Sequence, residues 1–145
     1  MSSFFTSYQK AKIKNQSYSL KFKDMEKIQF ETYQRIYQYA IAIVRYVKQL
    51  ADVSDSKIVC NQLLRSGTSV AANMIEARAA SSKKDFINFF NHALKSANET
   101  KFWLAIIRDT ENGQREAIKP LLQETTEIAN ILAASILTMK KKRQL

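Results

Sequence analysis

The stretch that decides the fold runs from residue 25 to residue 50 and reads MEKIQFETYQRIYQYAIAIVRYVKQL. Its apolar side chains recur every three or four residues, which is the spacing of one face of an α-helix. They form two neighbouring stripes, one made of Ile28, Ile36, Tyr39, Ile43, Tyr46 and Leu50, the other of Phe30, Tyr33, Tyr37, Ala40, Val44 and Val47. The pattern predicts a long amphipathic helix over about residues 26–50.

The same periodicity continues along the rest of the chain. Ser82 stands three residues before Asp85, the spacing of a capping box, and so marks the start of a helix. Asn112-Gly113 marks a turn, and Pro120, which has no N–H for a helical ladder, places the start of the last helix near residue 119. Three further helices are predicted, over about residues 55–79, 83–111 and 119–142.

The composition agrees with an all-α protein. The 145 residues include only 2 Gly and 1 Pro, too few for the turns of a β-sandwich or barrel. Long helices joined by short loops pack as antiparallel neighbours. We therefore expect an up-down-up-down antiparallel four-helix bundle over residues 25–143, preceded by a basic, aromatic-containing N-terminal arm over residues 1–24. No apolar run is long enough for a membrane span and no secretory signal is recognisable, so a cytoplasmic protein without a membrane partner is expected.

The net charge of +10 is concentrated at the two ends of the chain. Residues 24–139 hold 14 basic and 13 acidic residues, whereas the terminal segments carry nine cations and no acidic residue up to position 143. Such a pattern indicates a polyanionic partner, and its alternative is that charged ends only keep an apolar bundle in solution. We expect the phosphates of RNA or single-stranded DNA to contact Lys10, Lys12, Lys14, Lys21, Lys23, Lys140, Lys141, Lys142 and Arg143.

Topology predicts where this charge gathers. An even number of antiparallel helices returns the chain to the end at which it started, so both basic segments are expected on one rim of the bundle. The turn between the second and third helices is expected at the opposite end, which would be close to neutral.

The middle of the second helix is rich in small residues and reads SGTSVAA at 66–72. A helix without a charged outer face is usually buried all round. A mid-helix Gly costs about 1 kcal/mol relative to Ala, which makes sense if another helix crosses there. We therefore predict that this helix makes a contact between subunits, with packing inside one chain as the alternative. The predicted oligomer interface consists of Gly67, Val70, Ala71 and Met74.

Polar residues on the second and third helices recur at spacings of three and four, which places them on shared faces. They are predicted to form a structural polar network of Arg65, Ser69, Asn73, Glu76, Ser96 and Glu99. A di-metal site in a bundle needs Glu-x-x-His pairs from two helices, and the chain has a single His. Neither a Gly-x-Ser-x-Gly elbow nor a phosphate loop is present. The sequence thus predicts no catalytic residue, no metal and no cofactor, and Cys60 is interpreted as inert core.

Residues 64–76, LRSGTSVAANMIE, resemble the signature of the bacterial four-helix-bundle proteins encoded in intervening sequences of large-subunit ribosomal RNA genes. The likeness continues into SKKDF at 82–86 and ALKSANE at 93–99 and covers about residues 25–140, although Ala77 stands where the family usually has Gly. The resemblance implies a homopentameric ring of bundles with no known catalytic activity. The chain is also similar in fold to the accessory variability protein of diversity-generating retroelements, a basic pentamer that binds nucleic acid and a reverse transcriptase.

Two functions of different classes follow, together with a third that the residues disfavour. The first is a non-enzymatic, homo-oligomeric and, by resemblance, pentameric scaffold that binds nucleic acid. The second is a protein–protein adaptor that docks on a nucleic-acid enzyme such as a reverse transcriptase. The third is a helix-turn-helix regulator built from residues 70–78 and 83–90, whose recognition helix would carry Phe86, Phe89 and Phe90, which belong in a core.

Overall fold

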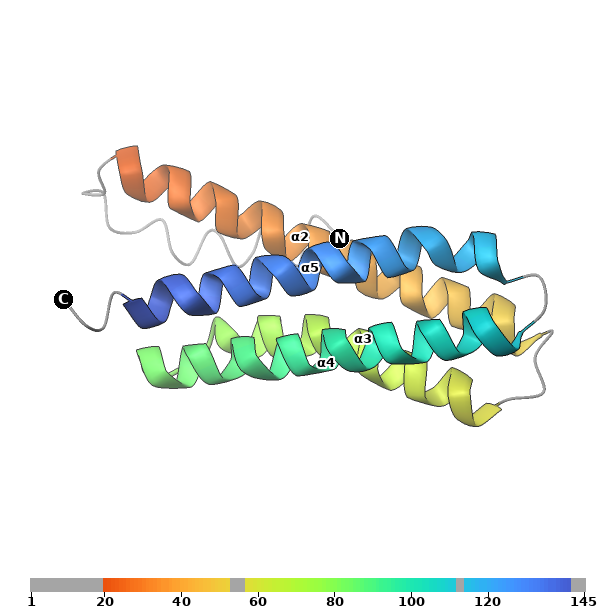
Figure 1. Ribbon diagram of the computed structural model, residues 1–145. Helices are drawn as coiled ribbons and strands as arrows, with labels where there is room; N and C mark the ends of the chain where they lie inside the picture. The colour runs from red at the N-terminus through yellow and green to blue at the C-terminus, as the bar shows by residue number, and fades with distance from the viewer. Residues whose placement is uncertain (1–19, 53–56, 112–113, 142–145) are drawn as a thin grey trace. The chain divides into compact units, whose positions relative to one another are not determined.

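The computed structural model describes residues 20–52, 57–111 and 114–141, and it shows four helices and no strand in this part of the chain (Figure 1). The helices are α2 (Leu20–Ala51), α3 (Lys57–Ala77), α4 (Lys83–Thr110) and α5 (Arg115–Lys141). The chain divides into two units, Met1–Thr32 and Tyr33–Leu145. The first contains residues 20–32 of α2, and the second contains the rest of α2 with the other three helices. The predicted all-α four-helix bundle is confirmed.

The core of the second unit is built from the stripes that the periodicity defines. On α2, Ile36, Ile43 and Leu50 are at most 2% exposed. Full burial of each such side chain stabilises the fold by about 1.5–3 kcal/mol. The partners from the other helices are equally buried and include Leu63, Val70, Ala93, Leu104, Ile107, Ile118, Ile128 and Leu132.

Two helices begin earlier than the sequence predicts. Helix α2 starts at Leu20 rather than near residue 26, because LKFKDM contains no Gly or Pro that would end a helix. Helix α5 starts at Arg115, and Pro120 lies inside it rather than at its start. Pro120 is exposed, so water can reach the Glu116 carbonyl that a proline N cannot bond. The predicted cap of α4 is confirmed, since the Ser82 side chain accepts a hydrogen bond from the Asp85 N–H at 3.1 Å.

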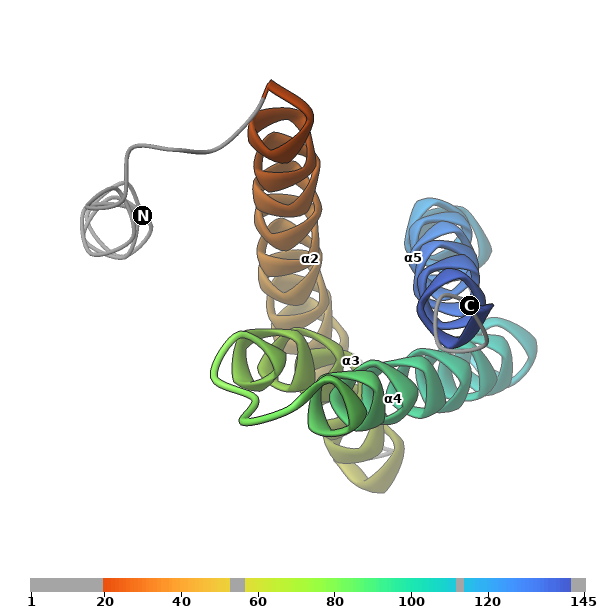
Figure 2. The same cartoon turned by 90° about the vertical axis from the view of Figure 1, so that its left-hand side faces the viewer.

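The placement predicted for the turn between the second and third helices is wrong. This turn joins α3 to α4 and lies at the same end of the second unit as the end of α5, as Figures 1 and 2 show. The reason is topological, because α3 and α5 run in the same direction and therefore finish at the same end. The end of the second unit opposite to this turn is the one where α2 and α4 finish.

The helix-turn-helix interpretation is also wrong. Residues 70–77 are the last turns of the 21-residue α3, and residues 83–90 are the first turns of the 28-residue α4. The two helices lie side by side and antiparallel over their length (Figure 1). Phe90 is only 8% exposed, so it packs in the core and is unavailable for a DNA groove.

A cluster of buried hydroxyl groups fixes the register of α2, α4 and α5. The Tyr39 hydroxyl lies 2.9 Å from the Thr125 hydroxyl, and the Thr100 hydroxyl lies within hydrogen-bonding reach of the same tyrosine. All three residues are at most 2% exposed. Burial raises the pKa of Tyr39 to about 12, against the smaller lowering effect of its hydrogen bonds. The two threonine hydroxyls donate to carbonyls of their own helices, whereas the buried Tyr39 hydroxyl needs a partner from another helix, which favours one axial alignment of α2 against α4 and α5.

Candidate functional site

The described part of the predicted phosphate-binding set lies on the last turn of α5. Lys140 and Lys141 are both exposed there, and no ion pair among the described residues involves either of them. Lys21 and Lys23 belong to α2, before its described side chains begin at residue 30. The remaining members lie outside the described residues: Lys10, Lys12, Lys14, Lys142 and Arg143.

The polar residues of α3 and α4 form a surface cluster. The Arg65 guanidinium bonds to the Glu99 carboxylate across the two helices, and these side chains are 62% and 36% exposed. Arg65 also donates from Nε and an Nη to Gln62 Oε1, at 3.2 and 2.9 Å. The Trp103 indole N–H donates weakly to Glu99 at 3.4 Å. Ion pairs this exposed contribute only about 0–1 kcal/mol, so the cluster orients side chains more than it stabilises the fold.

The other members of the predicted polar network bond within their own helices. The Ser69 hydroxyl donates to the Arg65 carbonyl at 2.7 Å, and the Asn73 amide donates to the Ser69 carbonyl at 2.8 Å. Ser96 takes part through its carbonyl, which accepts from the Thr100 hydroxyl at 2.7 Å. Glu76 is exposed and makes no side-chain hydrogen bond or ion pair with another described residue. Among the described residues, the predicted network thus holds one ion pair between helices, Arg65 with Glu99; the other hydrogen bonds of its members lie within single helices, and Glu76 takes part in none of them.

Replacing Glu76 with alanine is therefore expected to leave the melting temperature unchanged or slightly raised. The side chain is exposed, and a carboxylate in the last turn of α3 opposes the helix dipole. Exposed substitutions of this kind change the free energy of unfolding by less than about 0.5 kcal/mol. Thermal unfolding followed by circular dichroism measures the effect, with Glu124→Ala as the comparison because Glu124 does hold a partner. A clear drop for Glu76→Ala would show that Glu76 belongs to the network after all.

An ion cluster that the sequence pattern does not predict joins α2 and α5. Arg35 bonds to Glu124 through two parallel contacts, Nε to Oε1 at 2.6 Å and an Nη to Oε2 at 2.7 Å, and it also bonds to Glu127. The hydrogen bond to Glu124 is the main reason that the pKa of Arg35 lies above its ordinary value. The hydrogen bond from Arg35 is in turn the main reason that the pKa of Glu127 is lowered. Arg35 and Glu124 are 89 positions apart, and no local spacing rule links residues so distant.

The residues predicted to join subunits are mostly core residues of the chain itself. Val70 and Met74 are at most 2% exposed, and a Cβ added at Gly67 would lie 2.7 Å from Cγ2 of Ile43 on α2. The helix that crosses at Gly67 is thus a helix of the same chain, which was the alternative explanation. The role of Gly67, Val70 and Met74 is corrected accordingly, and only Ala71 keeps part of its surface exposed. Self-association itself stays a prediction.

Among the described residues of the second unit, three other large apolar side chains are exposed. Ile58 on α3, Phe102 on α4 and Leu137 on α5 are 75%, 55% and 60% exposed. Phe102 also packs edge-on against Trp103, with ring centroids 4.9 Å apart. Exposed apolar groups of this size are candidates for contact with another protein.

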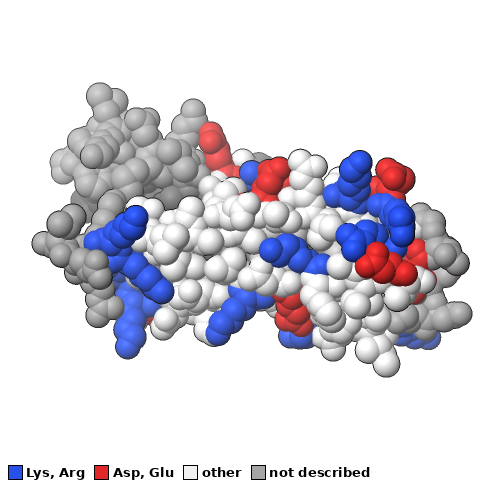
Figure 3. Space-filling model, viewed as in Figure 1, with Lys and Arg blue, Asp and Glu red and all other residues white. Residues whose placement is uncertain are grey.

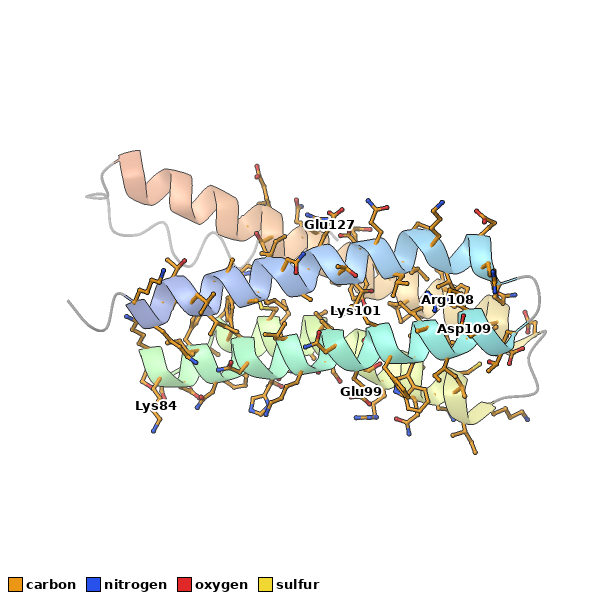
Figure 4. The ribbon with its side chains drawn as sticks, in the orientation of Figure 1. Lys84, Glu99, Lys101, Arg108, Asp109 and Glu127 are labelled. Carbon is orange, nitrogen blue, oxygen red and sulfur yellow. The ribbon has the colours of Figure 1, made fainter. Side chains whose placement is uncertain are left out.

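An open groove of about 490 Å³ follows the end of α4 and the first turns of α5. Its lining carries both signs of charge, with Arg108, Arg115 and Lys119 beside Glu116 and Glu127. Arg108, labelled in Figure 4, bonds to its neighbour Asp109 at 2.8 and 2.9 Å. That bond lowers the pKa of the Asp109 carboxyl. The mixed charge makes this groove a poor site for a polyanion.

The described residues hold no group of three or more His, Cys, Asp and Glu side chains that could bind a metal ion. Cys60 is a free thiol and is buried. Among the helices in the described ranges, none is both long and apolar enough to cross a bilayer.

The protein is thus an all-α, antiparallel four-helix bundle with ionic clusters on its surface. Residues 28–134 match the family model of the 23S rRNA-intervening sequence protein, and the chain belongs to that family. It is similar to a crystal structure of a protein of unknown function from the S23 ribosomal protein family of Bacteroides thetaiotaomicron. The two share 39% identity over 72% of this chain and 97% of the other, with a TM-score of 0.69. Comparison with curated proteins finds no match.

Proposed function

We propose that the protein is a non-enzymatic, homo-oligomeric scaffold that binds nucleic acid through its phosphates. The observation that supports this most directly is the contrast between two kinds of cation. Arg35, Arg65 and Arg108 all bond to carboxylates, whereas Lys140 and Lys141 are exposed without an ion-pair partner among the described residues. Cations that no carboxylate neutralises are available to an external anion.

Self-association would multiply this charge. The family resemblance implies a pentamer, and several copies of one basic end on a single particle bind a long polyanion far better than one copy does. With Gly67, Val70 and Met74 used inside the chain, a contact between subunits would have to use exposed groups such as Ile58 or Phe102. Light scattering at micromolar concentration reports the assembly, and a monomer would remove this part of the proposal.

The test is an electrophoretic shift of the full-length protein with single-stranded RNA and DNA homopolymers across a salt series. We expect binding that is indifferent to base identity, because lysine contacts to phosphate carry no sequence information. The logarithm of the binding constant should fall with the logarithm of the salt concentration by about 0.7 per phosphate neutralised. Absence of binding at low salt would refute the proposal.

The second candidate is the adaptor that docks on a nucleic-acid enzyme such as a reverse transcriptase. The exposed side chains of Ile58 and Phe102 favour it, since they offer an apolar surface to a protein partner. Capture of such an enzyme that survives high salt, by a protein that does not itself shift nucleic acid, would favour the adaptor.

A further inference from the structure

We infer that Lys83 and Lys84 at the start of α4 and Lys140 and Lys141 at the end of α5 form one surface that binds the phosphate backbone of a nucleic acid. Together these four residues make up the basic end of the second unit. The inference rests on the proposed function and adds to it two lysines on α4, which the sequence alone links to a helix start and to the family motif but not to a ligand.

The hydroxyl cluster shows that the two pairs of lysines lie at the same level of the bundle. Thr100 on α4 and Thr125 on α5 lie beside the same Tyr39 hydroxyl. Lys83 is 17 residues before Thr100, and Lys141 is 16 residues after Thr125. The helices are antiparallel and neighbouring, so at 1.5 Å per residue both lysines lie about 25 Å from the cluster towards one end. Figure 4 shows Lys84 at the end of the second unit where α5 also finishes.

All four lysines of the basic end are exposed. Among the described residues, no ion pair involves any of them. In Figure 3 blue side chains predominate at the left-hand end, whereas blue and red alternate at the right-hand end. Both pairs are thus open to an external anion.

The turn that carries Lys83 and Lys84 is held by its own hydrogen bonds. Ser82 caps α4 by accepting from the Asp85 N–H at 3.1 Å. Asp85 Oδ2 accepts from the Ser81 N–H, also at 3.1 Å. The carboxylate of Asp85 is therefore engaged with the turn, and the backbone that presents the two lysines is fixed before any ligand binds. A fixed backbone lowers the ordering cost of binding.

Helix stability does not explain the lysines on α4. Cations are favourable at the C-terminal end of a helix, so Lys140 and Lys141 stabilise α5 whether or not they bind a ligand. Lys83 and Lys84 stand in the first turn of α4, where a cation opposes the helix dipole. Their position is unfavourable for the isolated helix, and an anion lying against them would offset that cost. Lys83 and Lys84 are therefore the residues that decide the inference.

The partner that fits is a nucleic-acid backbone. Four ammonium groups on two adjacent helix ends present donors to several phosphates in succession, and they carry no geometry for reading bases. A lipid surface is disfavoured for the lysines on α4. Cations that bind membranes flank an apolar helix face that enters the bilayer. Lys83 and Lys84 instead lie in a capped turn between two serines and an aspartate.

The experiment compares three full-length double variants with the wild type, all binding single-stranded RNA and DNA homopolymers across a salt series. Lys83→Gln/Lys84→Gln and Lys140→Gln/Lys141→Gln each remove two charges from the basic end. Lys48→Gln/Lys57→Gln removes the same charge from exposed lysines at the opposite end and is the matched control. Each basic-end pair should reduce the salt slope by about 1.4, from about 0.7 for each of two phosphates. The control should keep the wild-type slope.

Each outcome decides something different. If the wild type binds and Lys83→Gln/Lys84→Gln keeps the slope of the control, the inference is wrong while the proposed function stands. If the wild type does not bind, both fall. A second measurement follows the binding of the same proteins to phosphatidylserine vesicles. If Lys83→Gln/Lys84→Gln loses vesicle binding but keeps nucleic-acid binding, the surface binds a membrane and the inference is overturned. Thermal melting checks the fold, and the α4 variant should melt no lower than the wild type, since it removes cations that oppose the dipole.

Discussion

Replacing Gly67 with valine is expected to lower the free energy of unfolding by about 2 kcal/mol, and replacement with alanine by a smaller amount. A Cβ at this position would lie 2.7 Å from Cγ2, 3.0 Å from Cγ1 and 3.3 Å from Cβ of Ile43. Ile43 is fully buried and β-branched, and a β-branched side chain in a helix strongly prefers one χ1 rotamer, so its methyl group moves aside only at a cost. Overpacking of this kind costs about 1–3 kcal/mol, which exceeds the gain of about 1 kcal/mol from removing a mid-helix glycine. Urea unfolding followed by circular dichroism measures the loss.

The control is the same glycine substitution made in an Ile43→Ala background. That background lacks both Cγ atoms, so Gly67→Ala should there be neutral or stabilising relative to Ile43→Ala alone. Ile43→Ala itself is expected to cost about 2–5 kcal/mol, and the comparison is therefore made within each background. An equal loss in both backgrounds would show that Ile43 is not the neighbour that limits position 67. If Gly67→Val left melting unchanged and only dissociated an oligomer, the contact between subunits would be reinstated.

The fold was predictable because every helix carries its own periodic apolar stripe. Ile36, Ile43 and Leu50 follow one another at seven-residue intervals, and burial of such a stripe requires neighbouring helices. Helix starts were less predictable, because they depend on weak local preferences. Nothing in LKFKDM stops a helix, and an exposed Pro120 is tolerated inside α5.

Gly67 shows why the partner of a buried surface was harder to predict. A small residue in a helix indicates that something approaches closely, and the same signal arises whether that helix comes from the same chain or from a second copy. Only the three-dimensional position of Ile43 distinguishes the two. The separation of 89 positions between Arg35 and Glu124 hid their ion pair for a similar reason.

Lys83 and Lys84 had a visible signal, two adjacent lysines after a serine pair. The capping pattern of Ser82 and Asp85 and the likeness of residues 82–86 to the family motif both account for this stretch, and neither calls for a ligand. The topological error placed this turn at the wrong end, far from Lys140 and Lys141. Counting from the shared hydroxyl cluster brings the two pairs together, which composition alone could not do.

Replacing Thr125 with valine is expected to destabilise the fold more than replacing Tyr39 with phenylalanine. Thr125→Val leaves the buried Tyr39 hydroxyl without the partner that lies 2.9 Å away, and an unsatisfied buried hydroxyl costs about 1–3 kcal/mol. Tyr39→Phe removes the hydroxyl itself, and Thr125 still donates to the Leu121 carbonyl at 2.6 Å, so this change should cost about 1 kcal/mol. Urea unfolding of both variants gives the order directly. The reverse order would mean that Thr100 satisfies the Tyr39 hydroxyl on its own.

The double variant and the pH dependence test the same cluster independently. Tyr39→Phe/Thr125→Val should be less destabilised than the sum of the single changes, because two apolar groups replace a matched polar pair.

The pKa of Tyr39 is raised to about 12 from an ordinary value of 10.0, mainly by burial. A raised pKa means that the stability due to the neutral phenol is complete below pH 10 and is lost as the pH rises towards 12. The free energy of unfolding of the wild type should therefore fall between pH 10 and 12, and that of Tyr39→Phe should fall less. The pKa of Tyr46 is also raised to about 12, so Tyr46 contributes to the decline in both proteins. An identical alkaline decline in the wild type and in Tyr39→Phe would show that the Tyr39 hydroxyl is not held in the core.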